Sequence, residues 1–360
     1  MEPLSVFLAA PPGLEPQLLD EARAIGLPGP KAVAGGVECG GGWEAVRRAN
    51  LRSRIAGRVL ARIARFPARG FPAVEAGLRA VDWRAWLGDV PARAEGAAAR
   101  SRAAHGGAVA AKLEAALARA GCAIDADGVR AMARLDRDVC TVSLDTSGAP
   151  LHQRGFKRAV NAAPLRETLA AGFLRAAGWD GTAPVVDPMC GSGTFVIEAA
   201  EAAAGLRPGR ARAFAFERLP SHDAERWAAL RAEAAPGTAA RFAGSDRDAG
   251  AVAMAAANAT RAGVGDLCAF AHRAVSDAAP PEGPPGLVIV NPPYGRRIGS
   301  RVHPLYAAFG RAMRGRFAGW RVAMVCPDAG LARAAGLDWG PPGPVVDHGG
   351  VKVRLWTADL

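Results

Sequence analysis

In the second half of the chain, short apolar runs alternate with longer stretches whose apolar residues recur at helical spacing. The runs predict strands and the stretches predict helices, because buried strands are short whereas helices need ten or more residues. The predicted strands are 185–187, 241–244, 287–290, 321–325 and 351–357, and the predicted helices are 195–204, a helix that runs through 258–261, and 305–316. This alternation is typical of a doubly wound α/β domain.

The first 150 residues lack this strict alternation. Their apolar spacing predicts strands at 5–9, 54–66 and 139–144, helices at 15–25, 44–51, 71–79 and 108–120, and a glycine-rich hairpin that ends at 40–42. Such a mixed order is typical of α+β structure. We therefore expect three domains, at 1–42, 43–150 and 151–360.

Composition narrows the class of protein. Half of the 360 residues are hydrophobic and 22% are charged, which is enough apolar material for packed cores and excludes a disordered or collagen-like chain. No apolar run approaches the roughly 20 residues of a membrane-spanning helix, and the first residues do not resemble a secretion signal. The six cysteines stand singly, so we expect reduced thiols, no metal centre and a cytoplasmic location.

Positive charge is concentrated in one stretch of the chain. The formal net charge is +11, and because lysine occurs at only four positions, 41 arginines carry most of the positive charge. Between residues 44 and 102 there are 13 arginines and five acids, a local excess of +8. Arginine suits bidentate contact with phosphate, so this stretch predicts a phosphate-binding surface, although a GC-rich genome also produces such a bias.

A predicted strand that stops at an acid and turns through two glycines carries the first candidate site. Residues 187–194 read DPMCGSGT, in which Gly191 and Gly193 permit positive φ and close backbone approach where a helix begins. A dinucleotide-binding loop needs a third glycine where this chain has Val196. An acid before the glycines suits an ammonium group better than a pyrophosphate, so Asp187 indicates a nucleoside that bears an amino acid.

Two more predicted strands end in polar residues. Asp246 follows the second strand, where an acid can hold both hydroxyls of a ribose. Asn291, Pro292, Pro293 and Tyr294 follow the strand predicted at 287–290. The prolines stiffen this loop and leave carbonyls without matching N–H groups, while the asparagine offers a side-chain carbonyl and the tyrosine a ring. Together these four residues can grip a planar group with an exocyclic amine.

These segments resemble a known family. DPMCGSGTFVIEAA, GSDRD with NATRAGV, NPPYGRRIG and the preceding LHQRGFKRAVNAAPLRETLAA are similar to motifs of THUMP-containing class I S-adenosylmethionine-dependent RNA methyltransferases, above all the bacterial enzymes that methylate guanine N2 in 23S rRNA. RANLRSRIAGRVLARIARF and VDWRAWL are similar to the family's N-terminal region. The resemblance implies a Rossmann-like methyltransferase domain, whose seven-stranded sheet has an antiparallel last strand, after an α+β ferredoxin-like and THUMP region. Because the sequence ends at Leu360, we expect it to lack the second methyltransferase domain of some members.

The resemblance also implies roles for particular residues. S-adenosylmethionine would be held by Ala163, Pro164, Leu165, Thr168, Asp187, Pro188, Gly191, Ser192, Gly193, Thr194, Asp246 and Asn291. The catalytic residues that position the target amine would be Asn291, Pro292, Pro293 and Tyr294. Many members have an acid after the third strand that meets the adenine amine, and 271–277 carries none at that position unless Asp277 substitutes. RNA contacts are expected from Arg47, Arg48, Arg52, Arg58, Lys112, Arg154 and Arg158.

Other functions stay open. The Asn-Pro-Pro-Tyr sequence also serves DNA adenine-N6 and protein glutamine-N5 methyltransferases, and the N-terminal resemblance with its arginines favours RNA. Among RNA substrates, guanine N2 of tRNA is the alternative to 23S rRNA, although THUMP-bearing tRNA enzymes tend to read Asn-Leu-Pro-Tyr. A non-catalytic RNA-binding assembly factor that keeps the cofactor fold is a further alternative. We expect RNA as partner, and neither a membrane nor a metal.

Overall fold

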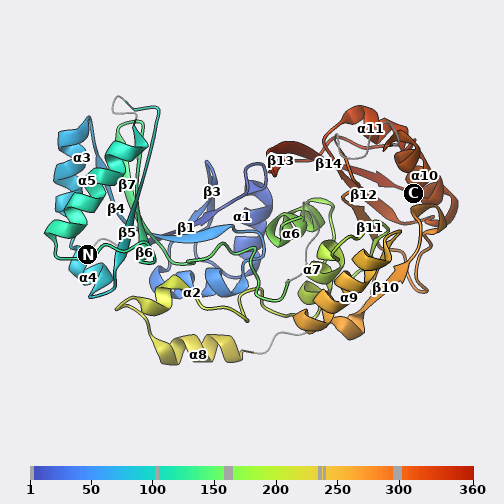
Figure 1. Cartoon of the computed structure of the whole chain (residues 1–360), viewed down its shortest axis with the longest axis horizontal. Coiled ribbons are helices and arrows are strands. Elements are labelled where there is room, and N and C mark those ends of the chain that lie inside the picture. The colour runs from blue at the N-terminus through green and yellow to red at the C-terminus, as the bar shows by residue number, and fades with distance from the viewer. Residues whose placement is uncertain (1–3, 102–104, 158–164, 234–236, 238–240, 295–301) are drawn as a thin grey trace. The chain divides into compact units, whose positions relative to one another are not determined.

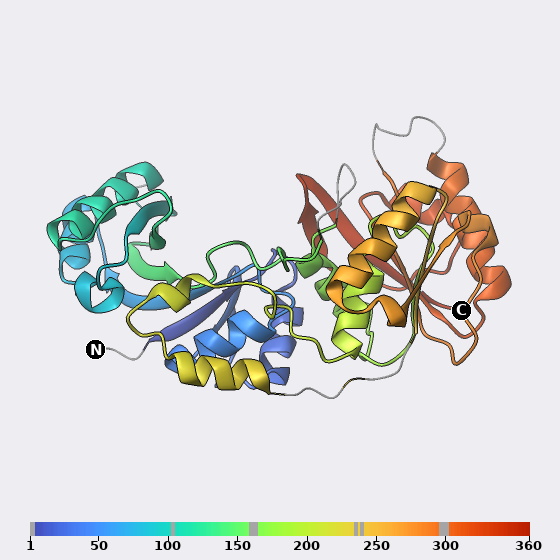
Figure 2. The same cartoon turned by 60° about the horizontal axis from the view of Figure 1, so that its bottom comes forward.

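The computed structural model describes residues 4–101, 105–157, 165–233, 237, 241–294 and 302–360. They form two compact units, each with its own seven-stranded sheet (Figures 1 and 2). The first unit comprises Met1–Ala10, Leu19–Leu151 and Arg212–Glu233, and the second comprises Pro11–Leu18, His152–Ala211 and Ala234–Leu360. The three predicted domains stay a prediction, but the strands of the first two share one sheet.

The sheet of the first unit has the order β2-β3-β1-β4-β7-β6-β5, with antiparallel neighbours except for the parallel pair β5 and β6. Its strands are β1 (Ser5–Ala9), β2 (Lys31–Val33), β3 (Gly36–Cys39), β4 (Arg58–Pro67), β5 (Ala92–Ala99), β6 (Val129–Asp136) and β7 (Val139–Asp145). The strands predicted at 5–9 and 139–144 are confirmed, and β2 and β3 form the predicted glycine-rich hairpin.

Helices cover one face of this sheet. They are α1 (Glu15–Ala24), α2 (Gly42–Arg52), α3 (Phe71–Arg79), α4 (Trp83–Leu87) and α5 (Gly106–Arg119), and α8 (Ala224–Ala232) packs on α2. The α2 helix packs on β1 and β4, and α5 packs on β5 and β6 (Figure 1). Along β4, Val59, Ala61 and Ile63 are buried whereas the alternate residues are partly exposed, as expected when one face of a strand meets helices.

The strand predicted from residue 54 begins four residues later, at Arg58. The buried carboxylate of Glu21 explains the difference, because it accepts hydrogen bonds from the amides of Arg54 and Ile55 at 2.9 and 3.2 Å. It also accepts one from the Ser53 hydroxyl at 2.6 Å. Amides that pair with a carboxylate are not available to a neighbouring strand, so the chain turns here before β4 begins.

The sheet of the second unit has the order β10-β9-β8-β11-β12-β14-β13. Its strands are β8 (Val185–Asp187), β9 (Phe242–Asp246), β10 (Cys268–His272), β11 (Leu287–Val290), β12 (Arg321–Cys326), β13 (Val345–His348) and β14 (Val351–Asp359). The first five are mutually parallel, and β14 runs antiparallel to both β12 and β13. The predicted α/β sheet with an antiparallel last strand is therefore confirmed.

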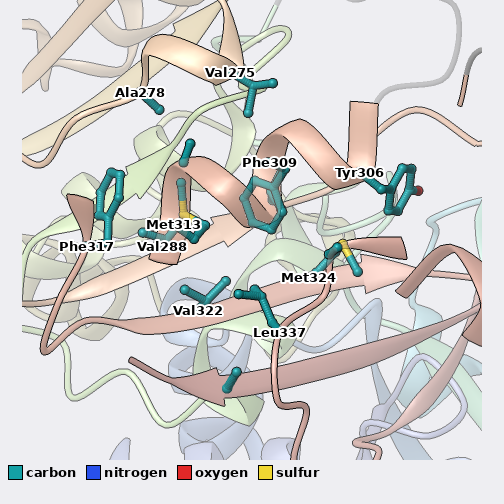
Figure 3. Close-up of a cluster of buried hydrophobic side chains, with 14 of the residues drawn as sticks. Val275, Ala278, Val288, Tyr306, Phe309, Met313, Phe317, Val322, Met324 and Leu337 are labelled. Atoms are coloured by element: carbon teal, nitrogen blue, oxygen red, sulfur yellow. The ribbon is translucent and has the colours of Figure 1, made fainter. Parts of the chain in front are cut away.

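Helices pack on both faces of this second sheet. They are α6 (Glu167–Ala176), α7 (Thr194–Ala203), α9 (Ala249–Ala262), α10 (Val302–Arg316) and α11 (Ala329–Ala334). One apolar cluster joins α10 to the sheet: Figure 3 shows Phe309 and Met313 of the helix, and Phe317 just after it, beside Val288 and Met324 of the strands. Burial of each such side chain contributes about 1.5–3 kcal/mol, so this layer holds the carboxyl ends of β11 and β12 in place.

Candidate functional site

Three neighbouring parallel strands end in the polar residues that the sequence singled out. In the register of the sheet, Val186 of β8 lies beside Val288 of β11, and Asp187 lies beside Gly244 of β9. Asp187, Asp246 and Asn291 therefore follow strands that end at one edge of the sheet. Adjacent strands lie about 4.8 Å apart, so one small molecule can reach all three residues. Ligands of doubly wound sheets bind at this edge.

The glycine loop between β8 and α7 is fixed by its neighbours. Gly191 and Gly193 have φ values of 52° and 83°, which side-chain-bearing residues rarely adopt. A Cβ atom at Gly193 would lie 3.0 Å from the Cβ of Ala255, so α9 leaves no room for one. Asn258 of α9 donates a hydrogen bond to the Ser192 carbonyl at 3.1 Å. The loop thus presents its backbone, rather than side chains, where α7 begins.

Asp187 is an acid in an apolar place. It is 3% exposed, and its Oδ1 accepts a hydrogen bond from the Met189 amide at 3.0 Å. The pKa of Asp187 is raised to about 8: burial is the main cause, the hydrogen bond from the amide opposes the rise, and the nearby Asp246 carboxylate adds to it. Both influences that raise the pKa, burial and a second carboxylate, disfavour the charged form of Asp187. A ligand that brings an ammonium group would supply the missing positive charge.

Asp246 is oriented by backbone amides. Its Oδ2 accepts a hydrogen bond from the Gly191 amide and its Oδ1 accepts one from the Asp248 amide, both at 3.0 Å. Each carboxylate oxygen has a further lone pair, so two more donors can bind. A ribose offers two adjacent hydroxyls, which is the pattern that this carboxylate can accept.

Lys157 ties the segment before α6 to the start of α7, and sequence reasoning missed it. Its Nζ donates to the Thr194 hydroxyl at 2.9 Å and to the Leu165 carbonyl at 3.0 Å, and it lies 3.3 Å from a Glu167 oxygen. The resemblance assigned Leu165 and Thr168 to the cofactor. Both are buried, and Leu165 itself accepts a hydrogen bond from Lys157. Ala163 and Pro164 lie outside the described residues.

The four residues after β11 differ in exposure. Pro292 is buried, Pro293 is exposed, and Asn291 and Tyr294 are partly buried. The Asn291 Oδ1 atom is shielded from solvent and has no hydrogen-bond partner in the described part of the chain. A buried acceptor without a donor costs about 1–3 kcal/mol, so a ligand that donates an N–H at this point would be favoured. The Tyr294 hydroxyl makes a hydrogen bond to Nδ1 of His348 at 2.7 Å.

Two of the arginines predicted to contact RNA are buried in the structure, which argues against that role. The side chains of Arg47 and Arg154 are only 5% and 1% exposed. Arg154 lies 3.3 Å from the equally buried Glu198, and Arg47 lies 3.5 Å from Glu44. A side chain that is buried against its own domain cannot reach a phosphate group of RNA.

The other predicted RNA contacts keep part of their side chains exposed, between 22% and 39%. Each pairs with an acid: Arg48 with Glu44, Arg52 with Glu233, Arg58 with Asp145, and Lys112 with Glu75. Their contact with RNA stays a prediction. Arg158 lies outside the described residues.

The structure does not identify an acid near β10 that would contact the adenine amine. His272, the last residue of that strand, is exposed and its Nε2 lies 3.0 Å from the Arg247 carbonyl oxygen. Asp277 lies in an exposed turn.

Within the described residues, no three histidine, cysteine or acidic side chains gather as a metal site, and no helix is long and apolar enough to cross a membrane.

Comparison with known proteins identifies the family. The description "RMKL-like, methyltransferase domain" matches residues 154–338, and "RlmL ferredoxin-like domain" matches residues 5–60. The ribosomal RNA large subunit methyltransferase K/L of Methylococcus capsulatus is 34% identical over 98% of this chain and 51% of its own. The chain spans about half the length of the curated relatives it matches.

Two solved structures resemble the whole chain. SMU.472, described as a methyltransferase and complexed with SAH, gives a TM-score of 0.89 at 26% identity, over 100% of this chain and 99% of that one. A structure from Listeria monocytogenes, described as an N6-adenine-specific DNA methylase, gives a TM-score of 0.89 at 28% identity, over 99% and 96%. With the strand order and the match over 154–338, these similarities show that the chain belongs to the family of RMKL-like methyltransferase domains.

Proposed function

We propose that this protein transfers a methyl group from S-adenosylmethionine to the exocyclic N2 amine of a guanine in 23S rRNA. Support for the substrate comes from the Methylococcus capsulatus relative, whose name states an activity on large-subunit ribosomal RNA. Support for the chemistry comes from the family and from the edge of the second sheet. An rRNA substrate also places the reaction in the cytoplasm.

The residues at this edge fit S-adenosylmethionine. The buried Asp187, with its raised pKa, suits the ammonium of the methionine part. Asp246 can accept hydrogen bonds from the two ribose hydroxyls, and the crowded Gly193 lets the ligand approach the backbone at the start of α7. The first N–H groups of a helix favour a carboxylate, which the methionine part also carries.

The Asn291 Oδ1 atom, which has no hydrogen-bond partner among the described residues, is the observation that carries the assignment of an amine substrate. An exocyclic amine of a base brings two N–H groups, and the asparagine oxygen and the Pro292 carbonyl are acceptors for them. Bonds to both acceptors turn the nitrogen lone pair away from the protein. Proline at 292 and 293 holds these acceptors rigid, because each ring fixes φ.

The protein contributes little covalent chemistry to this reaction. When bound, S-adenosylmethionine supplies a methyl group that is already activated by its sulfonium. This chain orients the amine through Asn291 and Pro292, and its oxygens stabilise the positive charge that develops on the nitrogen. The base has to leave its stack, which costs a few kcal/mol, and stacking on the Tyr294 ring offsets part of that cost.

Docking of the RNA is assigned to the first unit. Arg48, Arg52, Arg58 and Lys112 are partly exposed there, within a region of positive net charge. Their pairing with acids lowers the cost of holding each side chain in place but leaves the net charge unchanged. Phosphate contacts of this kind position an RNA without reading its sequence.

Methylation of purified RNA tests the proposal. The protein would be incubated with S-adenosylmethionine and, in parallel, with unmethylated 23S rRNA, tRNA, double-stranded DNA and a glutamine-containing peptide. Nucleoside mass spectrometry should find N2-methylguanosine in 23S rRNA. Methylation in the tRNA, DNA or peptide arm instead would establish one of the alternative substrates. Cofactor binding without methylation in any arm would support the non-catalytic alternative.

Asn291→Ala is the first variant to test. We expect it to lower turnover by about 100- to 1,000-fold, the usual effect of removing one oriented polar group from a transition state. Affinity for S-adenosylmethionine, measured by calorimetry, should change little, which also shows that the variant is folded. Normal turnover in this variant would contradict the role of the asparagine oxygen.

A further inference from the structure

A hydrogen bond joins the end of the Asn-Pro-Pro-Tyr segment to a residue far along the chain. The Tyr294 hydroxyl lies 2.7 Å from Nδ1 of His348, and the two rings lie nearly perpendicular, with centroids 6.4 Å apart. His348 is the last residue of β13, 54 residues after the tyrosine. It belongs to none of the motifs that define the candidate site.

The tyrosine remains a neutral phenol over the range in which enzymes work. The pKa of Tyr294 is raised to about 12, mainly by burial and also by the nearby Cys326 at the end of β12. Tyr306 of α10 shares this neighbourhood, since its hydroxyl lies 3.7 Å from the Cys326 sulfur. A neutral phenol can donate a hydrogen bond to an imidazole nitrogen or accept one from it, so the contact with His348 survives either tautomer.

The position of His348 is set by a tight hairpin. β13 pairs with β14 so that His348 faces Val351, and only Gly349 and Gly350 lie between them. Both glycines have positive φ, 64° and 84°, which is what a two-residue hairpin loop requires. The Gly350 amide donates to the Asp347 side chain at 3.0 Å, which further fixes the turn. The imidazole is therefore carried on a rigid element.

Holding the hydroxyl fixes the ring. The phenol oxygen lies on the axis of χ2, so a hydrogen bond to it restrains χ1 and fixes where the ring lies. Because a phenol O–H lies in the plane of its ring, a bond that the hydroxyl donates also favours a ring plane that contains the acceptor. Without that bond, Tyr294 would rely on packing alone, and it is only partly buried. The hydroxyl that is committed to His348 also leaves the ring itself, rather than its polar end, as the part of Tyr294 that a base can use.

We propose that His348 is a positioning residue for methyl transfer, which holds the Tyr294 ring at the orientation in which the target base stacks beside Asn291. This inference rests on the proposed function. Because His348 acts through the tyrosine, it affects the step after cofactor binding. The proposed cofactor residues Asp187 and Asp246 are the last residues of other strands, β8 and β9.

A double-mutant cycle tests the coupling. His348→Ala and Tyr294→Phe should each lower kcat about three- to tenfold, the effect of one hydrogen bond, with the KM for S-adenosylmethionine within about twofold of normal. The double variant should lose no more than either single variant, because both remove the same bond. Multiplied losses in the double variant, or normal turnover in His348→Ala, would overturn the inference.

Two conservative variants separate positioning from general support of the hairpin. Asparagine places its amide near the position of Nδ1, whereas glutamine places it near Nε2. We therefore expect His348→Asn to retain most of the turnover and His348→Gln to behave like His348→Ala. Equal loss in both would show that the imidazole supports the fold rather than the tyrosine hydroxyl.

A spectroscopic readout works without activity. The chain contains two tyrosines, Tyr294 and Tyr306, so protein with ¹³C-labelled tyrosine rings gives signals from these two only. Tyr294→Phe assigns them by removing one. His348→Ala should shift the Tyr294 signal and leave the Tyr306 signal in place, and His348→Asn should restore it. An unmoved Tyr294 signal would refute the inference.

The two readouts keep this inference apart from the proposed function. If the wild-type protein methylates no RNA, the proposed function fails, and the tyrosine signals still decide whether His348 holds the ring. If the wild type methylates 23S rRNA and the His348→Ala variant does so equally well, the inference fails alone.

Discussion

At the scale of single residues, the proposed contact between Asp187 and the cofactor ammonium would couple cofactor binding to pH. Its carboxyl is buried and its pKa is raised to about 8, so the free protein holds a proton there at neutral pH. In the proposed contact, the ammonium of S-adenosylmethionine pairs with the ionised form. Binding therefore has to expel the proton, and this cost disappears as the pH rises through the pKa of the free protein.

We expect the affinity for S-adenosylmethionine to rise by up to about tenfold per pH unit between about pH 6 and about pH 8. Calorimetry in two buffers with different ionisation enthalpies should detect the release of close to one proton per ligand at the lower end of this range. Asp187→Asn is the control, because an amide cannot titrate. Affinity that is independent of pH in the wild type would contradict the assignment of Asp187 to the ammonium.

Some of the residues at the site were predictable, and others were not, for a physical reason. Asp187 and Asn291 stand next to predicted strand ends, so their placement follows from local pattern. Lys157 acts on Thr194, 37 residues away, and His348 acts on Tyr294, 54 residues away. Those pairings depend on the packing of separate elements, which local sequence does not encode.

The burial of Arg47 and Arg154 was not predicted, for a related reason. Residue counts register charge but not burial, and an arginine can be buried when an acid pairs with it. Arg154 does this with Glu198, which lies on α7. The burial of Arg154 could not be predicted from the sequence, because only the folded structure identifies Glu198 as its partner.

At the scale of elements, the segment that ends at Lys157 is attached to two helices. Arg154 pairs with Glu198 of α7, and the Phe156 carbonyl accepts a hydrogen bond from Arg261 of α9 at 3.0 Å. The Lys157 ammonium then bonds to Thr194, the first residue of α7. These contacts hold the segment against the start of the helix that follows the glycine loop.

Removal of the lysine contact should weaken cofactor binding. We expect Lys157→Met to lower the affinity for S-adenosylmethionine by about tenfold, because it removes charge-assisted bonds to Thr194 and Leu165 that fix both ends of the site. Lys31→Met is the matched control, since Lys31 is exposed on β2 of the other unit. Equal affinity in the two variants would mean that Lys157 plays no part in holding the site, and circular dichroism would show that each is folded.

Four strands, β5, β6, β10 and β13, were not predicted from the sequence. β5, β10 and β13 are edge strands of their sheets, where fewer residues are buried and the apolar pattern is weaker. β5 reads ARAEGAAA, and its Gly96 is required because a Cβ there would collide with the backbone of Ala110 in α5. β6 is different, because its apolar residues alternate clearly and Val129, Ala131, Ala133 and Leu135 are buried, so its pattern does predict a strand.

At the scale of the whole molecule, the two units exchange segments of chain. Arg212–Glu233 lies within the second half of the sequence but belongs to the first unit. There Arg212 donates hydrogen bonds to the carbonyls of Ser147, Ala149 and Pro150 at 2.6–3.0 Å. The predicted boundary near residue 150 therefore marks one of several crossings, and a cut at that point would separate each unit from part of its own chain.

The segment Pro11–Leu18 makes the opposite crossing. It precedes most of the first unit in sequence, yet it belongs to the second. Leu14 is fully buried and lies against Gly172 of α6. Gly13, at φ 96°, lies so close to the Val345 carbonyl of β13 that a Cβ would collide with it. The close approach explains why this position is a glycine, and it ties the segment to the edge strand that carries His348.

This crossing predicts which unit each of two leucines stabilises. Leu14→Ala and Leu8→Ala each remove a fully buried side chain, so each should cost about 2–5 kcal/mol of stability. Leu8 lies on β1, opposite Val59 of β4, and is the matched control. Hydrogen exchange followed by mass spectrometry should show faster exchange in α6 for Leu14→Ala and in β4 for Leu8→Ala, because buried contacts protect the elements they join. Faster exchange in β4 for both variants, with α6 unchanged, would place residues 11–18 with the first unit.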